Sequence, residues 1–170
     1  MPIKIGSTKI TPKGIKRAYY GSDLVYKKVS KNLFKTTGTS TTAGGVRFEV
    51  QSDGSVVCTG TATGYASWTM GRALVNSSMG NVTISVNGTY GNAGNIAVDR
   101  VQIRNSSNTS IATVSYGTWT QSATVDLSQY PTAASIYVSL KRNSNTTTNA
   151  VIKTQIELGT KATSWEPYED

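Results

Sequence analysis

The sequence predicts an all-β protein: an antiparallel β-sandwich, of jelly-roll topology, preceded by a small N-terminal β-hairpin arm. Apolar and polar residues alternate with a period of two from about residue 46 to residue 158. This alternation gives each strand one buried and one solvent-facing side, as in antiparallel sheets stacked face to face. The chain is also rich in Ser, Thr, Asn and Gly, with 37% hydrophobic and only 15% charged residues. Many short strands joined by polar turns have this composition.

Residues 1–31 are predicted to form the arm, which holds two short hairpins. A Gly-Ser pair flanked by apolar residues occurs at residues 5–10 and again at residues 20–25. Glycine supplies the positive φ that a tight hairpin turn needs. Hairpins this small bury too little surface to be stable alone, so we expect the sandwich, a sister subunit or a larger assembly to order them.

The sandwich is predicted to begin after Asn32-Leu33-Phe34 and a polar loop at residues 36–45. About eight to ten strands then fit between residues 44 and 160, for which a jelly roll is the expected closure. Residues 65–76 mix aromatic residues with Ala and Met, and either a strand or a short helical turn fits them. The positions predicted to face the core are Val46, Phe48, Val50, Val82, Ile84, Val86, Val101, Ile103, Ala123, Val125, Leu127, Ile136, Val138, Leu140, Ile152, Ile156 and Leu158.

The net charge of +8 is concentrated near the N-terminus, where residues 1–35 carry nine basic side chains and one acidic one. Such asymmetry predicts that the arm docks on an acidic surface, and we expect that surface to be protein. Nucleic acid is an alternative partner, although we do not expect it; such binding would weaken steeply with salt. Lysines that merely protect exposed strand edges are a further alternative. The residues assigned to docking are Lys4, Lys9, Lys16, Arg17, Lys27 and Lys28.

The sequence argues against an enzyme. It contains no histidine, the commonest general base and a frequent zinc ligand. The single cysteine, Cys58, lies in an apolar run, so we expect it to be buried and unreactive. A glycosidase would need paired carboxylates, whereas Glu49 and Glu157 alternate with core residues and are predicted to be solvated. We therefore expect no catalytic residue and no cofactor; structural calcium at turn acids such as Asp53 and Asp126 is the alternative.

The C-terminal run at residues 155–168, QIELGTKATSWEPY, resembles the closing motif of jelly-roll modules in bacteriophage tail, baseplate and minor structural proteins. Asn32-Leu33-Phe34 resembles the segment that opens those modules, and the Gly-Ser repeats resemble segments near module junctions of virion proteins. In physical terms, Gly159 permits a turn after the last core strand. Trp165 and Tyr168 then fold back over the sandwich edge, while Pro167 stops further strand pairing.

The resemblance implies a phage virion protein with a carbohydrate-binding-module-like jelly roll at residues 32–170. Its arm, residues 1–31, would dock on the particle, with other virion proteins as partners and a homo-oligomer as the expected state. No segment of the sequence has the pattern of a signal peptide or a membrane span, so we expect synthesis in the host cytoplasm and assembly into the virion.

Recognition of a host surface polysaccharide is the alternative function. Sugar binding uses exposed aromatic rings that stack on pyranose faces. Five aromatic residues lie outside the cleanly alternating strands: Tyr65, Trp68, Tyr90, Tyr116 and Trp119. The first two fall in the irregular stretch, and the last two flank Gly117. We take Tyr65, Trp68, Tyr116 and Trp119 as the carbohydrate-binding candidates, with a core or edge-covering role as the competing interpretation.

Overall fold

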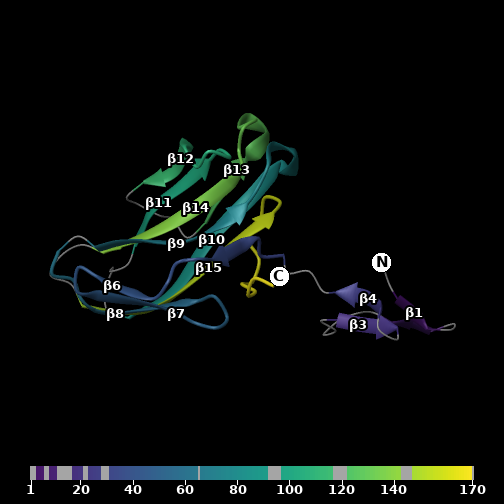
Figure 1. Ribbon diagram of the computed structural model, residues 1–170, viewed down its shortest axis with the longest axis horizontal. Coiled ribbons are helices and arrows are strands. Elements are labelled where there is room, and N and C mark those ends of the chain that lie inside the picture. Colours follow the sequence, from purple (N-terminus) through teal and green to yellow (C-terminus); the bar gives the residue numbers. More distant parts are fainter. Residues whose placement is uncertain are drawn as a thin grey trace. The chain divides into compact units, whose positions relative to one another are not determined.

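The computed structural model describes the backbone of residues 3–5, 8–10, 17–20, 23–27, 31–64, 66–91, 97–116, 122–142 and 147–169, and the side chains of residues 31–64, 67–86, 100–114, 122–140, 147 and 149–169. Most of these residues lie in strands (Figure 1), and the helices among them are two 3-10 turns, η1 (Ser77–Met79) and η2 (Leu127–Gln129). The chain divides into two compact units, residues 1–30 with 169–170 and Lys31–Tyr168. The predicted all-β class is confirmed.

The arm forms two antiparallel hairpins. Strand β1 (Ile3–Ile5) pairs with β2 (Thr8–Ile10), and β3 (Arg17–Tyr20) pairs with β4 (Asp23–Lys27). Each hairpin coincides with one Gly-Ser repeat, as predicted. Among the docking residues, Lys4, Lys9, Arg17 and Lys27 occupy strand positions, Lys16 and Lys28 lie outside the described residues, and the described side chains include none of the six.

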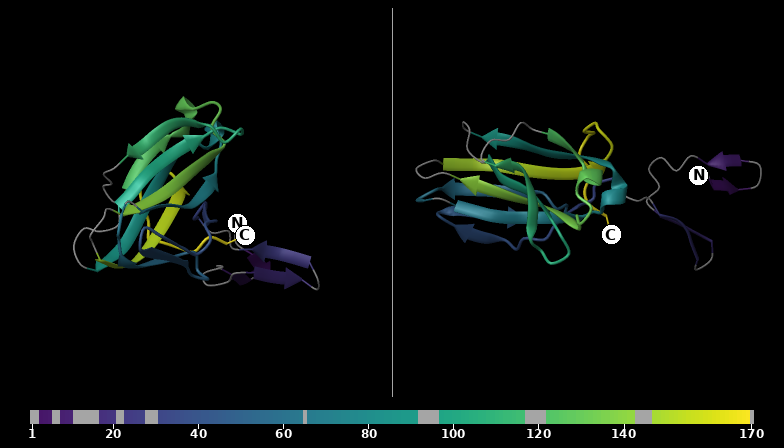
Figure 2. Two further views of the ribbon diagram at one scale, coloured as in Figure 1. Left: turned by 60° about the vertical axis from the view of Figure 1, so that its left-hand side comes forward. Right: turned by 90° about the horizontal axis from the view of Figure 1, so that it is seen from above.

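The second unit is a sandwich of two antiparallel sheets (Figures 1 and 2). The β15 sheet has the strand order β13-β10-β15-β8-β7-β6, and the β14 sheet has the order β12-β11-β14-β9-β5. Its strands are β5 (Phe34–Thr36), β6 (Thr41–Ala43), β7 (Val46–Val50), β8 (Val56–Thr61), β9 (Ala66–Leu74), β10 (Asn81–Gly91), β11 (Ala97–Arg104), β12 (Ser110–Tyr116), β13 (Ser122–Asp126), β14 (Ser135–Arg142) and β15 (Thr147–Leu158).

The strand pairing confirms the predicted jelly roll. Strand β8 pairs with β15, β9 with β14, β10 with β13 and β11 with β12. These pairs are nested, with the first strand of the series beside the last, and successive pairs alternate between the two sheets. A long antiparallel ribbon rolled into two sheets has this topology. The remaining strands, β5 to β7, extend the sheets at their β8 and β9 sides.

Two stretches, residues 36–45 and 65–76, contain more strand than the sequence predicted. The stretch predicted as a loop at residues 36–45 contains β6, because Gly44 and Gly45 form a tight two-residue hairpin turn into β7. Their φ angles are 52° and 83°, the positive values that such a turn requires. Most of the uncertain stretch at residues 65–76 is strand β9, which carries an irregularity opposite Val138 and Ser139.

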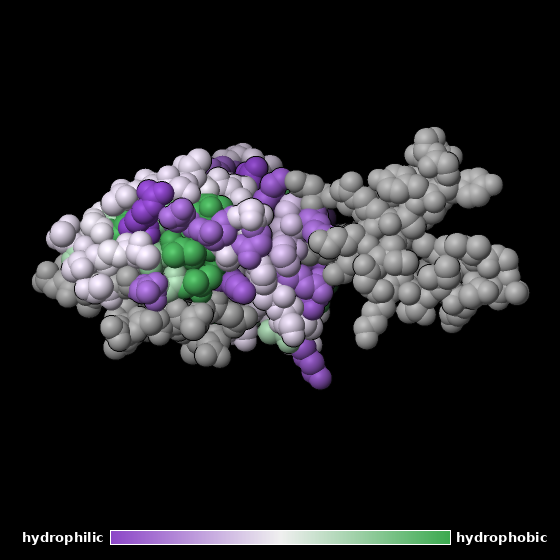
Figure 3. All heavy atoms as spheres, turned by 90° about the horizontal axis from the view of Figure 1, so that it is seen from below, coloured by the Kyte–Doolittle hydropathy of each residue, from purple (hydrophilic) through white to green (hydrophobic). Residues whose placement is uncertain are grey.

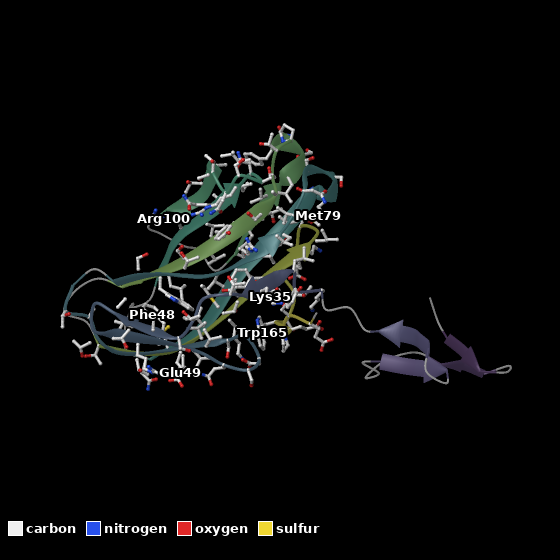
Figure 4. The ribbon with its side chains drawn as sticks, in the orientation of Figure 1. Lys35, Phe48, Glu49, Met79, Arg100 and Trp165 are labelled. Atoms are coloured by element: carbon white, nitrogen blue, oxygen red, sulfur yellow. The ribbon has the colours of Figure 1, made fainter. Side chains whose placement is uncertain are left out.

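The core lies between the two sheets and contains most of the predicted positions. Figure 4 shows the alternation in β7, where Phe48 points between the sheets and Glu49 points away from them. Leu158 departs from the prediction, since it is 59% exposed at the end of β15. The largest fully buried side chains are Phe34, Phe48, Met70, Ile84, Ile103, Leu127, Ile136, Leu140, Ile152, Ile156 and Gln155.

Candidate functional site

The opening and closing segments of the sandwich are joined through Asn32, which is 3% exposed. Its Nδ2 donates to the carbonyl oxygens of Thr154 at 3.1 Å and Glu166 at 2.9 Å. Its Oδ1 accepts from the backbone N–H of Phe34 at 2.9 Å and of Ile156 at 3.1 Å. One amide side chain therefore ties together β5, β15 and the C-terminal tail, which we define as residues 159–168.

The tail covers the outer face of β15, where Glu157 is 3% exposed and Gln155 fully buried. The prediction that Glu157 is solvated is therefore wrong. The Glu157 carboxylate accepts from the backbone N–H of Thr163 at 2.8 Å and from its hydroxyl at 2.6 Å. Gln155 donates to Glu157 at 2.8 Å and accepts from the backbone N–H of Glu166 at 2.8 Å. Alternation alone does not reveal this burial, because the covering segment comes from outside the sheet.

Hydrogen bonding keeps Glu157 ionised in this enclosed position. Burial acts to raise the pKa of its carboxyl group, but the donors of Thr163 and Gln155, together with the charge of Lys31, hold the pKa below the ordinary value. Lys31 lies 3.8 Å from the carboxylate of Glu166, which strengthens the same contact between the two ends of the sandwich.

Trp165, in the tail, folds back onto the sandwich as predicted, and it packs against β15. Its indole N–H donates to the carbonyl oxygen of Thr154 at 3.2 Å, and the ammonium group of Lys153 lies 4.7 Å from its ring centroid. Figure 4 shows Trp165 at the end of the sandwich where β5 begins. We refer to Asn32, Gln155, Glu157, Thr163 and Trp165, with these hydrogen bonds, as the latch. Its polar groups are engaged in holding the fold closed.

Among the predicted carbohydrate-binding residues, the structure describes the side chain of Trp68. Its half-buried ring packs against the core and stacks on Phe48, with ring centroids 5.2 Å apart. The backbone of Tyr116 lies at the end of β12, while its side chain, and all of Tyr65 and Trp119, lie outside the described residues. Trp68 therefore has the position of a core-covering residue, which was the competing interpretation.

A groove of about 370 Å³ lies on the outer face of the β14 sheet, where β5 pairs with β9. The tail borders this groove through Tyr168. Leu74, in this groove, is 67% exposed and is the most exposed large hydrophobic side chain among the described residues. The residues that line the groove are Leu33, Lys35, Thr37, Arg72, Leu74 and Tyr168.

A row of polar and aromatic side chains continues from this groove across the sheet. Lys35 lies directly opposite Arg72, Arg72 opposite Tyr137, and Tyr137 opposite Gln102. Arg72 donates to the Tyr137 hydroxyl at 3.1 Å, and the guanidinium of Arg104 lies 4.3 Å from the centroid of the Tyr137 ring. We call these five residues the cationic row. None of the described side chains on the strands of this sheet is a carboxylate.

The outer face of the β15 sheet is different in character. Val57 on β8 lies opposite Val151 on β15, and both side chains are partly buried. Nearby, Arg47 pairs with Glu49 at 3.2 Å. Figure 3, which views the side where β6, β7 and β8 lie in Figure 1, shows a small hydrophobic patch surrounded by hydrophilic residues. Charges of both signs occur on this face, whereas the described charges of the cationic row are all positive.

The turn acids proposed as calcium ligands serve local structure. Asp53 accepts from the hydroxyl and the backbone N–H of Ser55, and Asp126 accepts from the same groups of Ser128. These hydrogen bonds lower the pKa of each aspartate, and the bond from the serine hydroxyl has the largest effect. Within the described part of the chain, no group of three or more His, Cys, Asp or Glu residues has a geometry suited to a metal ion.

No protein-family model matches the chain, and no curated protein matches its sequence. Among the described residues, no helix is both long and apolar enough to span a membrane.

Proposed function

We propose that the chain is a non-enzymatic structural protein of a bacteriophage particle. In this proposal the arm, residues 1–31, docks on other virion proteins, and the jelly roll, residues 32–170, projects from the particle as part of a homo-oligomer. The observation that supports it best is the latch. The two segments on which the resemblance to phage modules rests are far apart in the sequence, yet Asn32 bonds both of them to each other.

The chemistry of the sandwich supports a role without catalysis. Burial raises the pKa of the Cys58 thiol to about 12, so the thiol stays protonated and is a poor nucleophile. The carboxylates of Asp53 and Asp126 are held by turn residues, and Glu157 is held by Thr163 and Gln155. These acids act as hydrogen-bond acceptors that fix turns and the tail.

The proposal is tested by deleting residues 1–30 in the phage that encodes the chain. Lys31 is kept because its ammonium group lies close to the carboxylate of Glu166 in the tail. We expect the truncated protein to keep the β-rich circular dichroism of the full chain and to be absent from purified particles, as measured by mass spectrometry. Full incorporation of the truncated protein would contradict docking through the arm. Absence of the full-length protein from particles would contradict the virion role itself.

Recognition of a surface polysaccharide is a second candidate function. The observation that favours it is the groove, in which the exposed Leu74 lies beside the cationic groups of Lys35 and Arg72. A site of this kind offers an apolar contact for sugar C–H groups and donors for their oxygen atoms. Binding of the full chain to an array of bacterial envelope polysaccharides tests this function; an array without any bound glycan contradicts it and leaves the structural role standing.

A further inference from the structure

We propose that the cationic row, Lys35, Arg72, Tyr137, Gln102 and Arg104, binds an acidic polysaccharide that carries carboxylate groups along its length. This inference rests on the second candidate function and gives it a site and a ligand class. The polysaccharide would lie across β5, β9, β14 and β11, on the outer face of the β14 sheet, with one end in the groove.

Positive charge is concentrated on this face of the β14 sheet. Lys35 and Arg72 are directly opposite each other on neighbouring antiparallel strands. Arg72 donates to the Tyr137 hydroxyl and the guanidinium of Arg104 lies over the ring of the same residue, so three cationic side chains lie along one row of the sheet. An anionic polymer complements such a concentration of positive charge.

The two arginines are held in place before any ligand arrives. Arg72 is oriented by its hydrogen bond to the Tyr137 hydroxyl, and Arg104 lies over the face of the same ring. Arg104 also donates to Gln102 at 2.8 Å and to Asn108 at 3.2 Å, while its buried Nε has no hydrogen-bond partner. Guanidinium groups fixed in this way lose little conformational freedom on binding a carboxylate.

The length of the row favours a repeating anion over a single one. Neighbouring strands lie about 4.8 Å apart, so the three steps from β5 to β11 span roughly 14 Å. Positive charges occur at both ends of this distance, on Lys35 and Arg104. The amide of Gln102, and the hydroxyl of Ser110 within 3.3 Å of it, add groups that exchange hydrogen bonds with sugar hydroxyls.

The aromatic geometry argues against single-stranded nucleic acid. Binding of unstacked bases uses aromatic faces that are open to the base. Here a cation already lies over each ring, since Arg104 lies over Tyr137 and Lys35 lies 5.3 Å from the centroid of Tyr168. The rings therefore serve to position cations, and the apolar contact comes from Leu33 and Leu74 in the groove.

The test is calorimetric titration of the full chain with polygalacturonate, a polymer of carboxylated sugars, and with dextran as the neutral comparison. We expect binding of polygalacturonate that weakens with added salt and no binding of dextran. Arg72→Gln and Arg104→Gln should each weaken binding about tenfold, because each removes a charge-assisted pair of hydrogen bonds. Arg72→Lys, which keeps the charge and loses the planar fork, should fall between the wild type and Arg72→Gln.

The matched control is Arg47→Gln, which removes one positive charge from the outer face of the β15 sheet. We expect it to change the affinity by less than about twofold, as for a screened surface charge. Equal weakening by Arg47→Gln and Arg72→Gln would overturn the proposed site, because binding would then depend on net charge alone. An absence of polygalacturonate binding, or tighter binding of poly-deoxythymidylate that the same variants reduce, would also overturn it. None of these results bears on incorporation into particles.

Discussion

Replacing Asn32 by alanine should cost more stability than any other single change of a polar residue in the latch. The substitution removes four hydrogen bonds, made to Phe34, Thr154, Ile156 and Glu166. Two buried backbone N–H groups, those of Phe34 and Ile156, lose their acceptor, which costs about 1–2 kcal/mol for each. The carbonyl of Thr154 keeps a donor, the indole N–H of Trp165. Adding about 0.5–1 kcal/mol for each of the two lost donations, we expect a loss of roughly 3–6 kcal/mol.

The assay is equilibrium unfolding in urea, followed by circular dichroism. A loss of this size is a large part of the total stability of an ordinary domain, about 5–15 kcal/mol, so the unfolding midpoint should shift visibly. Asn76→Ala is the control, since Asn76 is an exposed cap of η1 that accepts from Ser78. It should cost about 1 kcal/mol. Equal losses for Asn32→Ala and Asn76→Ala would refute the reasoning that Asn32 joins the ends of the sandwich.

Three further outcomes are expected. Because folding lowers the pKa of Glu157, its carboxylate stabilises the fold at pH values above the ordinary pKa of 4.5, and this stabilisation is lost as the pH falls through the lower pKa of the folded state. Glu157→Gln should therefore reduce the loss of unfolding free energy on acidification, measured by urea unfolding at several pH values. An unchanged dependence of the unfolding free energy on pH would contradict this. Gly71→Ala would place a Cβ against the backbone of β5 and 2.9 Å from the Phe34 ring, so it should destabilise the fold by about 1–3 kcal/mol, measured by thermal unfolding. Gly64→Ala is the control, because Gly64 has open space around it, and it should leave the melting temperature nearly unchanged. Trp68→Ala removes a ring stacked on Phe48 and should cost about 3–5 kcal/mol; an unchanged melting temperature would show that this ring does not pack in the core.

Much of the fold could be predicted because the relevant signals are local. Alternation in stretches such as Val46 to Val50 determines which side chains face the core, and Figure 4 shows the result for Phe48 and Glu49. The Gly-Ser repeats coincide with the hairpins of the arm for the same reason. The hairpin at Gly44-Gly45 lies in the stretch predicted as a loop, although a glycine pair between short apolar or Thr-containing runs is a hairpin signal.

The site residues could not be predicted, because they depend on strand register and on a segment that covers a sheet from outside. Arg72 and Tyr137 are far apart in sequence and become neighbours only through the pairing of β9 with β14. Glu157 alternates like a solvated residue, and it is buried only because Thr163 returns over it. Trp68 lies in the stretch whose secondary structure was undecided, so its inward orientation had no local signal.

The central claim is that this jelly roll is a structural part of a phage particle. A cryo-electron microscopy reconstruction of the particle tests it most directly. The account predicts density that fits the sandwich of Lys31–Tyr168 at every symmetry-equivalent position of one ring or vertex. Particles without such density, with the protein found in the soluble fraction of the lysate, would contradict the claim.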